Sequence, residues 1–280
     1  MREIHVSDIS DAVAKLCIDA NINLNADIYN AMNAARQQEQ LPIACQVLGV
    51  LLENAETAKR NNIPICQDTG MAVVFLEIGQ DVHVVGGSLE NAVNDGVVKG
   101  YVGGYLRKSV VYDPISRVNT NDNTPAVIHY DIVPGDVFEI TVAPKGFGSE
   151  NMSALKMLKP SEGIDGVKKF VLDVVRQAGP NPCPPIMIGI GVGGTMEKCA
   201  LLSKKALLRP VGTKNEDDFW AAIETELLAD INALDIGPAG FGGITTAFSV
   251  SIETYPTHIA GLPVAVNIGC HVTRHATANL

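Results

Sequence analysis

The sequence predicts an α/β protein in which a helical N-terminal segment is followed by a mixed sheet flanked by helices. Apolar residues recur at three- and four-residue intervals from residue 7 to about residue 60, as in amphipathic helices. From Met71 onward, short apolar and β-branched runs alternate with further helical patterns. The 280 residues are expected to form one subunit, with a subdivision into a helical segment, 1–62, and an α/β region, 63–280.

The N-terminal segment carries two helical patterns. Ser7 is expected to be the N-cap of the first helix, because its hydroxyl can accept a hydrogen bond from a free backbone N–H. The second pattern begins after Pro42 and ends in the polar stretch 59–62. The apolar pattern shortens after this stretch, which marks the start of the sheet.

The rest of the chain alternates strands with helices. Strands are predicted at 71–78, 82–86, 126–133, 136–143, 186–190, 245–252 and 264–268. Helices are predicted at 89–106, 164–177, 196–207 and 216–234. Pro134-Gly135 predicts a turn between two of the strands.

The charge balance and the apolar runs exclude two classes of protein. Lys and Arg total 21 against 31 Asp and Glu, and the net charge of −10 opposes the basic surface that nucleic-acid binding needs. No run approaches the roughly 20 apolar residues that span a bilayer, and the N-terminus lacks the pattern of a signal peptide. A cytoplasmic protein is expected, whose six cysteines are thiols or ligands rather than a disulfide scaffold.

The cysteines fall into two groups. Three lie within helical patterns, where a buried thiol acts as a small hydrophobic side chain: Cys17, Cys45 and Cys199. The other three lie beside Pro or Gly in predicted loops: Cys66, Cys183 and Cys270. The spacing of the second group alone does not indicate a metal site, because zinc and ferredoxin-type sites normally have short CxxC spacings.

A family resemblance suggests a function for the loop cysteines. The pentapeptide Cys66-Gln67-Asp68-Thr69-Gly70 resembles the first cluster-ligand motif of class I fumarases and L-tartrate dehydratases. Similar segments follow in the same order at 106–109, 145–151, 181–195, 206–212 and 258–270. The resemblance implies the α subunit of a fumarate hydratase of the tricarboxylic acid cycle, with L-tartrate dehydratase as the alternative. The loop 147–151 is more similar to the fumarase version.

The resemblance also implies a cofactor. The cysteines that match the family's ligands are expected to hold a [4Fe–4S] cluster: Cys66, Cys183 and Cys270. An iron without a protein ligand acts as a Lewis acid toward the C–OH bond of malate or toward water. A fourth cysteine ligand would close this open position.

Polar residues near the cysteines acquire roles by the same resemblance. Asp68 is expected to hydrogen-bond the hydroxyl that leaves as water, and Gln67 to contact the dicarboxylate substrate. Arg107 is expected to bind one carboxylate with both arms of its guanidinium. Gly148 is expected to offer its backbone N–H to the other carboxylate, and His258 to be an active-site histidine.

A partner is also implied. In single-chain members of the family, the part that resembles this sequence is followed by a second domain with further carboxylate-binding residues and a base for the C–H proton. A separate β subunit is therefore expected, in an α2β2 assembly, and the surface around the cluster is expected to be open and partly apolar.

Two other classes of function are weaker alternatives. The stretch 189–194 satisfies GxGxxG, but no strand ending in Asp or Glu follows about 20 residues later, as a nicotinamide-dependent dehydrogenase requires. A non-catalytic redox-sensing module would use the cysteines but not the polar residues around them.

The charged runs Lys204-Lys205 and 216–218 are expected on solvated faces, the second at a helix N-terminus.

Overall fold

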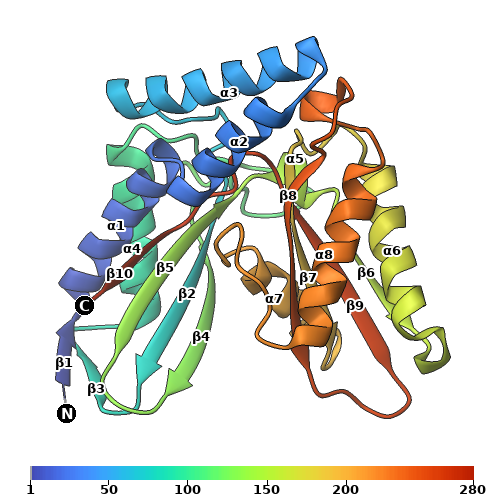
Figure 1. Cartoon of the computed structure of the whole chain (residues 1–280). Helices are drawn as coiled ribbons and strands as arrows, with labels where there is room; N and C mark the ends of the chain where they lie inside the picture. The colour runs from blue at the N-terminus through green and yellow to red at the C-terminus, as the bar shows by residue number, and fades with distance from the viewer. Residues whose placement is uncertain (1) are drawn as a thin grey trace. The chain divides into compact units, whose positions relative to one another are not determined.

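The structure, a computed structural model that describes residues 2–280, divides the chain into two compact units (Figure 1). Unit 1 consists of the residues up to Asn25, Ala55–Phe147 and Arg274–Leu280, and unit 2 consists of Ala26–Asn54 and Gly148–Thr273. Helix α3 (Pro42–Asn61) contributes residues to both units. The division thus does not follow the subdivision at residue 62 that the sequence suggested.

Unit 1 is built on a four-stranded sheet with the order β10-β5-β2-β4. Strand β2 is parallel to β4 and antiparallel to β5, and β5 is antiparallel to β10. Strands β1 and β3 form a separate parallel pair. The elements are β1 (Arg2–His5), α1 (Val6–Ile22), β2 (Met71–Gly79), β3 (Val82–Val85), α4 (Leu89–Gly103), β4 (Val127–Val133), β5 (Phe138–Lys145) and β10 (Ala276–Asn279).

Unit 2 contains a second four-stranded sheet with the order β6-β9-β7-β8, in which only β7 and β8 are parallel. Its strands are β6 (Ala154–Leu158), β7 (Ile186–Gly193), β8 (Ala247–Tyr255) and β9 (Leu262–Gly269). Its helices are α2 (Ala26–Gln38), α6 (Gly163–Ala178), α7 (Met196–Ala206) and α8 (Asp218–Asn232), with short 3₁₀ helices η1 (Pro160–Glu162) and η2 (Pro238–Gly240). The short helix α5 (Phe147–Glu150) begins at the boundary of the units.

The mixed α/β class is confirmed, and every predicted strand and helix has a counterpart. Three short strands were not predicted: β1, β6 and β10. The expected cap at Ser7 is wrong, because α1 begins at Val6 and the Nδ1 of His5 accepts the Ser7 N–H at 3.2 Å. The turn at Pro134-Gly135 is present, but β4 and β5 lie on opposite sides of β2 rather than beside each other. This turn passes over the end of β2, where a Cβ on Gly79 would lie 2.3 Å from the carbonyl oxygen of Gly135.

The core of unit 1 lies between its sheet and the helices α1 and α4. Side chains of α1 and α4 pack on alternate residues of β2 and β5, among them Val74 and Ile140. Cys17 is fully buried, and a Cβ on Gly100 of α4 would lie 2.8 Å from its Cβ, so the two helices approach closely. Burial of apolar side chains on one face of the sheet is the main stabilising contribution here.

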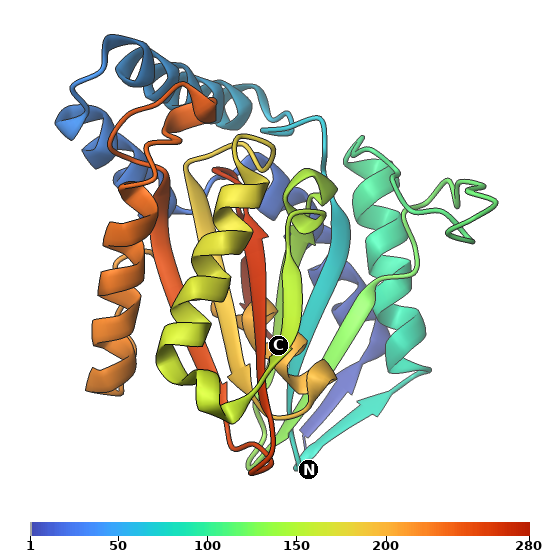
Figure 2. The ribbon, with the colours of Figure 1, turned by 90° about the vertical axis from the view of Figure 1, so that its right-hand side faces the viewer.

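Helices cover both faces of the sheet in unit 2. Helices α6 and α8 lie along one face and pack on Ile188 and Ile190 of β7 (Figure 2). The alternate residues Gly189 and Gly191 face α7 on the other side, where a Cβ would lie 2.1 Å from a helix carbonyl oxygen. The GxGxxG pattern is thus explained by close contact between α7 and the strand, which does not require a dinucleotide.

We expect Gly191→Ala to lower the free energy of unfolding by about 3 kcal/mol, because the added methyl group overpacks the contact with Cys199. Thermal denaturation followed by circular dichroism measures the effect. Gly103→Ala is the matched control, since a Cβ there meets nothing within 4 Å and alanine favours the helix by about 1 kcal/mol. Equal melting temperatures for the two variants would contradict the packing argument.

No helix among residues 2–280 has both the length and the apolar character needed to cross a membrane.

Candidate functional site

Cys66 lies in a tight turn between α3 and β2 that Asp68 holds together. The backbone N–H of Asp68 points to the Cys66 sulfur at 3.4 Å, and the Asp68 carboxylate accepts the N–H of Gly70 at 3.0 Å. The other carboxylate oxygen accepts the N–H of Phe147 at 2.9 Å, which fixes the start of α5. Gly70 has a φ of +77° and a Cβ there would collide with Lys145, so the turn requires glycine. Gln67 is exposed at the tip of the turn.

A buried polar shell connects this turn to the segment that carries Arg107. The Tyr101 hydroxyl donates to the carbonyls of Thr69 and Gly70, at 2.8 and 3.1 Å. The Thr69 hydroxyl donates to the carbonyl of Arg107 at 3.1 Å. Asn123, which is fully buried, donates to Gly70 and accepts the Ser109 N–H at 2.7 Å. The backbone of Arg107 is therefore fixed relative to the Cys66 turn, while its side chain is exposed.

Burial raises the pKa of Tyr101 well above its ordinary value, so its hydroxyl remains a hydrogen-bond donor across the physiological range. Neither Tyr101 nor Asn123 was expected at this site from the sequence. A tyrosine in a helical pattern and an asparagine in a polar loop give no local sign that they share one turn.

Unit 2 brings Cys183 and Cys270 together. Cys270 follows the end of β9, and Cys183 precedes the start of β7, which pairs with that end of β9 at Met187 and Gly269. The carbonyl oxygen of Cys183 accepts hydrogen bonds from the N–H and Nδ1 of His271, at 3.3 and 2.9 Å. The two loops are thus joined one residue away from Cys270.

The loops that carry Cys183 and Cys270 both require unusual backbone conformations. Cys183 is exposed and has a φ of +56°, a left-handed conformation that costs an L-residue about 1–2 kcal/mol. The carbonyl of Cys270 accepts both the N–H and the hydroxyl of Thr273, at 2.9 and 2.8 Å. A Cβ on Gly269 would lie 2.0 Å from that hydroxyl, so the glycine is required. Strain of this kind is common where a loop must present a functional side chain.

The other three cysteines differ from the loop cysteines. Cys17 is buried, which raises its pKa to about 12. Cys199 is buried, its pKa is raised by burial to about 11, and its thiol donates to the carbonyl of Gly191. The expectation that Cys45 is buried is only partly met, because its thiol is half-exposed and lies 3.7 Å from the carbonyl of Arg36.

His258 lies away from Cys270. It occupies the loop between β8 and β9, where its Nδ1 accepts the Ala260 N–H at 3.2 Å. β9 has eight residues, and eight extended residues span about 26 Å, so His258 and Cys270 lie at opposite ends of one strand. The active-site role that the resemblance implies for His258 stays a prediction.

Gly148 lies in the first turn of α5 and is exposed. A Cβ there would meet nothing within 4 Å, so chain packing does not explain the glycine. Two residues later, Glu150 pairs with Lys204 of α7 and accepts the Asn267 side chain of β9 at 3.0 Å. The expectation of a solvated Lys204 is therefore wrong, since this ion pair holds its side chain at 20% exposure.

The charged run 216–218 is exposed, as expected. Asp217 is the N-cap of α8 and accepts the Phe219 N–H at 2.8 Å. This run therefore has a structural role at the start of the helix.

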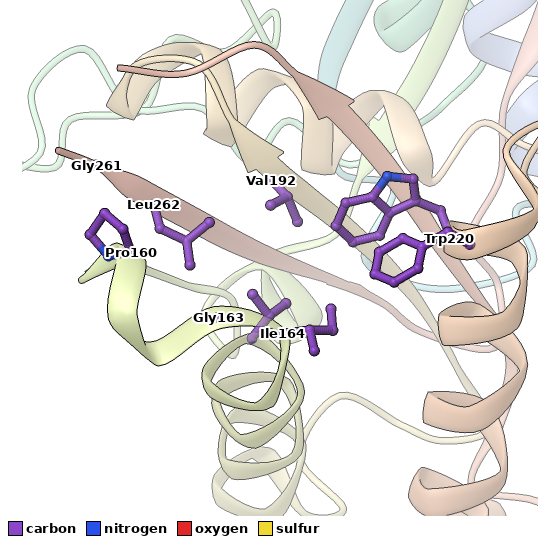
Figure 3. A pocket seen from close by; sticks show the side chains of 9 residues that line it. Pro160, Gly163, Ile164, Val192, Trp220, Gly261 and Leu262 are labelled. Carbon is purple, nitrogen blue, oxygen red and sulfur yellow. The ribbon is translucent and has the colours of Figure 1, made fainter. Parts of the chain in front are cut away.

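A hollow in unit 2 is a poor candidate for a dicarboxylate site. It has a volume of about 280 Å³ and is lined mainly by apolar side chains, including Ile164, Trp220 and Leu262 (Figure 3). Leu262 begins β9 and Cys270 follows its end, so the hollow lies at the opposite end of the strand from Cys270.

Among residues 2–280, no three His, Cys, Asp or Glu side chains are grouped closely enough to hold a metal ion. Two of the three expected ligands, Cys183 and Cys270, lie in hydrogen-bonded neighbouring loops of unit 2. Cys66 belongs to unit 1. All three are at least partly exposed thiols in hydrogen-bonded loops, which suits them to ligate a metal group better than Cys17 or Cys199. The chemistry of these three donors therefore fits an iron–sulfur group.

The structure defines a mixed α/β protein with thiol, carboxylate and guanidinium side chains at turns beside its strands. A family model described as fumarate hydratase (Fumerase) matches residues 10–279, and the chain belongs to this hydro-lyase family. A protein of Methanocaldococcus jannaschii, whose name assigns it provisionally as an L(+)-tartrate dehydratase subunit alpha, is 43% identical over 96% of both chains. The L(+)-tartrate dehydratase subunit alpha of Escherichia coli strain UTI89 is 32% identical over 97% of this chain and 90% of its own.

Proposed function

We propose that the chain is the α subunit of an iron–sulfur hydro-lyase that removes water from, or adds it to, a four-carbon dicarboxylate. The observation that carries this proposal is the shell of buried hydrogen bonds joining the Cys66-Asp68 turn to the Arg107 segment. This shell fixes the Cys66 thiol, the Asp68 carboxylate and the backbone of Arg107 relative to one another in unit 1. Membership of the fumarate hydratase family supports the reaction class.

The names of the relatives favour L-tartrate as the substrate over the fumarate expected from the sequence. Removal of water from L-tartrate gives oxaloacetate, and it breaks the same kind of C–OH bond as the dehydration of malate. Fumarate is the second candidate, supported by the description of the family model and by the loop 147–151.

Cys66, Cys183 and Cys270 would hold a [4Fe–4S] cluster, with one iron left without a protein ligand. When bound, such a cluster supplies a Lewis acid at that iron, which weakens a C–OH bond without electron transfer.

The chain's own residues position the substrate and move the proton of its hydroxyl group or of water. Two backbone N–H groups fix the orientation of the Asp68 carboxylate. It hydrogen-bonds the substrate hydroxyl, and in the hydration direction it accepts a proton from water. The exposed guanidinium of Arg107 binds one substrate carboxylate through two parallel hydrogen bonds. The exposed turn at Gly148 offers its backbone N–H to the other carboxylate.

A second polypeptide completes the enzyme in this proposal, as the subunit names of the relatives suggest. None of the residues placed above is positioned to remove the C–H proton beside a carboxylate. Exposed apolar side chains follow the Arg107 segment, including Tyr112 at 72%, Ile115 at 88% and Val118 at 60% exposure. Such side chains are suited to contact with another protein.

We expect the reconstituted chain alone to turn over neither substrate, and addition of the separately expressed β subunit to restore activity. The test purifies the chain anaerobically, rebuilds its cluster and measures two reactions with and without the partner. One assay follows oxaloacetate formed from L-tartrate, and the other follows the loss of fumarate absorbance. The ratio of the two kcat/KM values identifies the substrate. Full turnover by the lone chain, unchanged by the partner, would contradict the two-subunit proposal.

We expect Arg107→Lys to lower kcat/KM by about tenfold to a hundredfold, because an ammonium group cannot reproduce two charged hydrogen bonds to one carboxylate. Steady-state kinetics of the cluster-loaded complex measures the effect. Arg117→Lys, an exposed arginine in the same segment, is the matched control and should behave as the wild type. Unchanged kinetics in both variants would remove Arg107 from the substrate site.

A further inference from the structure

Arg274 is a buried arginine beside the Cys66 turn. It lies just before β10, four residues after Cys270, and only 4% of it is exposed. Its guanidinium donates a hydrogen bond to the backbone carbonyl of Asp68. Its Nε is buried and has no hydrogen-bond partner among residues 2–280.

No salt bridge of Arg274 occurs in the described part of the chain. The carboxylate of Asp68, the residue whose carbonyl Arg274 binds, accepts hydrogen bonds from the backbone N–H groups of Gly70 and Phe147 instead. Arg209 shows the ordinary arrangement, because its partly buried guanidinium pairs with Glu224 at 2.7 Å. A buried cation without a partner is costly, often by several kcal/mol, and is retained where an anion balances it.

The position of Arg274 suits an anion at Cys66, namely an iron–sulfur cluster that Cys66 would ligate. Asp68, whose carbonyl Arg274 binds, is two residues from Cys66, and the Asp68 N–H points to the Cys66 sulfur. A thiolate-ligated iron–sulfur cluster is anionic, and nearby N–H donors and positive charges stabilise such clusters.

We propose that Arg274 is a positioning residue that holds the backbone of the Cys66-Asp68 turn and supplies the positive charge that balances an anionic cluster at Cys66. This inference rests on the proposed function, because it requires that Cys66 ligates a cluster. Arg274 stabilises the bound cluster, and it acts on the substrate only through the turn that it holds.

The experiment compares variants of the full chain after anaerobic reconstitution. Arg274→Gln removes the charge but keeps a hydrogen-bond donor, and Arg274→Lys keeps the charge. The readouts are iron and sulfide per chain, the rate of iron release to a ferrous chelator, the electron paramagnetic resonance spectrum of the oxidised cluster, and the melting temperature. Arg209→Lys is the matched control, since this arginine is also shielded from solvent but belongs to unit 2 and is ion-paired.

We expect Arg274→Gln to release iron about tenfold faster than the wild type and to alter the cluster spectrum. Arg274→Lys should recover most of the wild-type iron retention, whereas Arg209→Lys should change the melting temperature alone. Wild-type iron release and spectrum in a folded Arg274→Gln chain would overturn the inference. If that variant does not fold, the spectrum of the cluster in Arg274→Lys decides, because lysine keeps the charge but moves it: a spectrum that differs from those of the wild type and Arg209→Lys supports the inference, and an unchanged spectrum rejects it. A wild-type chain that takes up no iron rejects the proposed function itself.

Discussion

Single Cys→Ser replacements at Cys66, Cys183 and Cys270 are expected to abolish hydro-lyase activity and to lower the iron bound after anaerobic reconstitution. Each of these thiols lies in a loop with an exposed or half-exposed sulfur, as a ligand to a shared metal group requires. Removing one of three protein ligands opens a second iron to solvent and destabilises the whole group. Iron and sulfide analysis, visible absorption and activity with the partner subunit measure the outcome.

Cys45→Ser is the matched control for these variants, because its sulfur is also half-exposed but lies against α2, near the carbonyl of Arg36. It should retain wild-type iron and activity. Cys17→Ala and Cys199→Ala should do the same, with some loss of stability from the cavity left behind. Full iron content and activity in all three loop variants would show that the ligands lie elsewhere.

Asp68→Asn is expected to lower kcat by about a hundredfold to ten-thousandfold, the usual contribution of a positioned proton-transfer group. The amide cannot take a proton from water, and its NH2 would face a backbone N–H of either Gly70 or Phe147. Cluster content should remain close to that of the wild type, because Cys66 is unchanged. Kinetics of the cluster-loaded complex, with iron analysis of the same sample, measures both quantities.

Asp113→Asn provides a matched control, since Asp113 also accepts two backbone N–H groups, those of Ile115 and Ser116, in a turn of unit 1. Its kinetics should be those of the wild type. Asp68→Asn chains that keep both their iron and their kcat would limit Asp68 to the role of an ordinary turn residue.

Local sequence patterns predicted the helices and strands better than the way in which these pack into two units. The strand 71–78 has enough consecutive apolar residues to identify it unaided, and β2 is found there. β10 was missed because Ala276–Asn279 is short and half polar, and only pairing with β5 makes it a strand. The two interleaved units also escaped prediction, because contacts between distant segments leave no periodic pattern in the sequence.

The same limit applies to the candidate site. Turn chemistry at Asp68 and Gly70 and the loop positions of Cys183 and Cys270 were readable, since Asp, Gly and Pro restrict the backbone locally. Arg274 carried no such sign, because its burial depends on an Asp68 carbonyl more than 200 positions away in the sequence. The strand predicted at 264–268 is β9, which separates His258 from Cys270.

The interleaved chain path has a consequence for the order of folding during synthesis. All residues of unit 2 precede position 274, whereas unit 1 takes the edge strand of its sheet from residues 274–280. Residues 274–280 then pair with β5, and the Arg2 side chain bonds to the carbonyl of Leu280. Contacts between residues so far apart form slowly, because a long loop must close before they give any stabilisation. We infer that β5 keeps an unpaired edge, open to proteases and chaperones, until residues 274–280 fold back onto it.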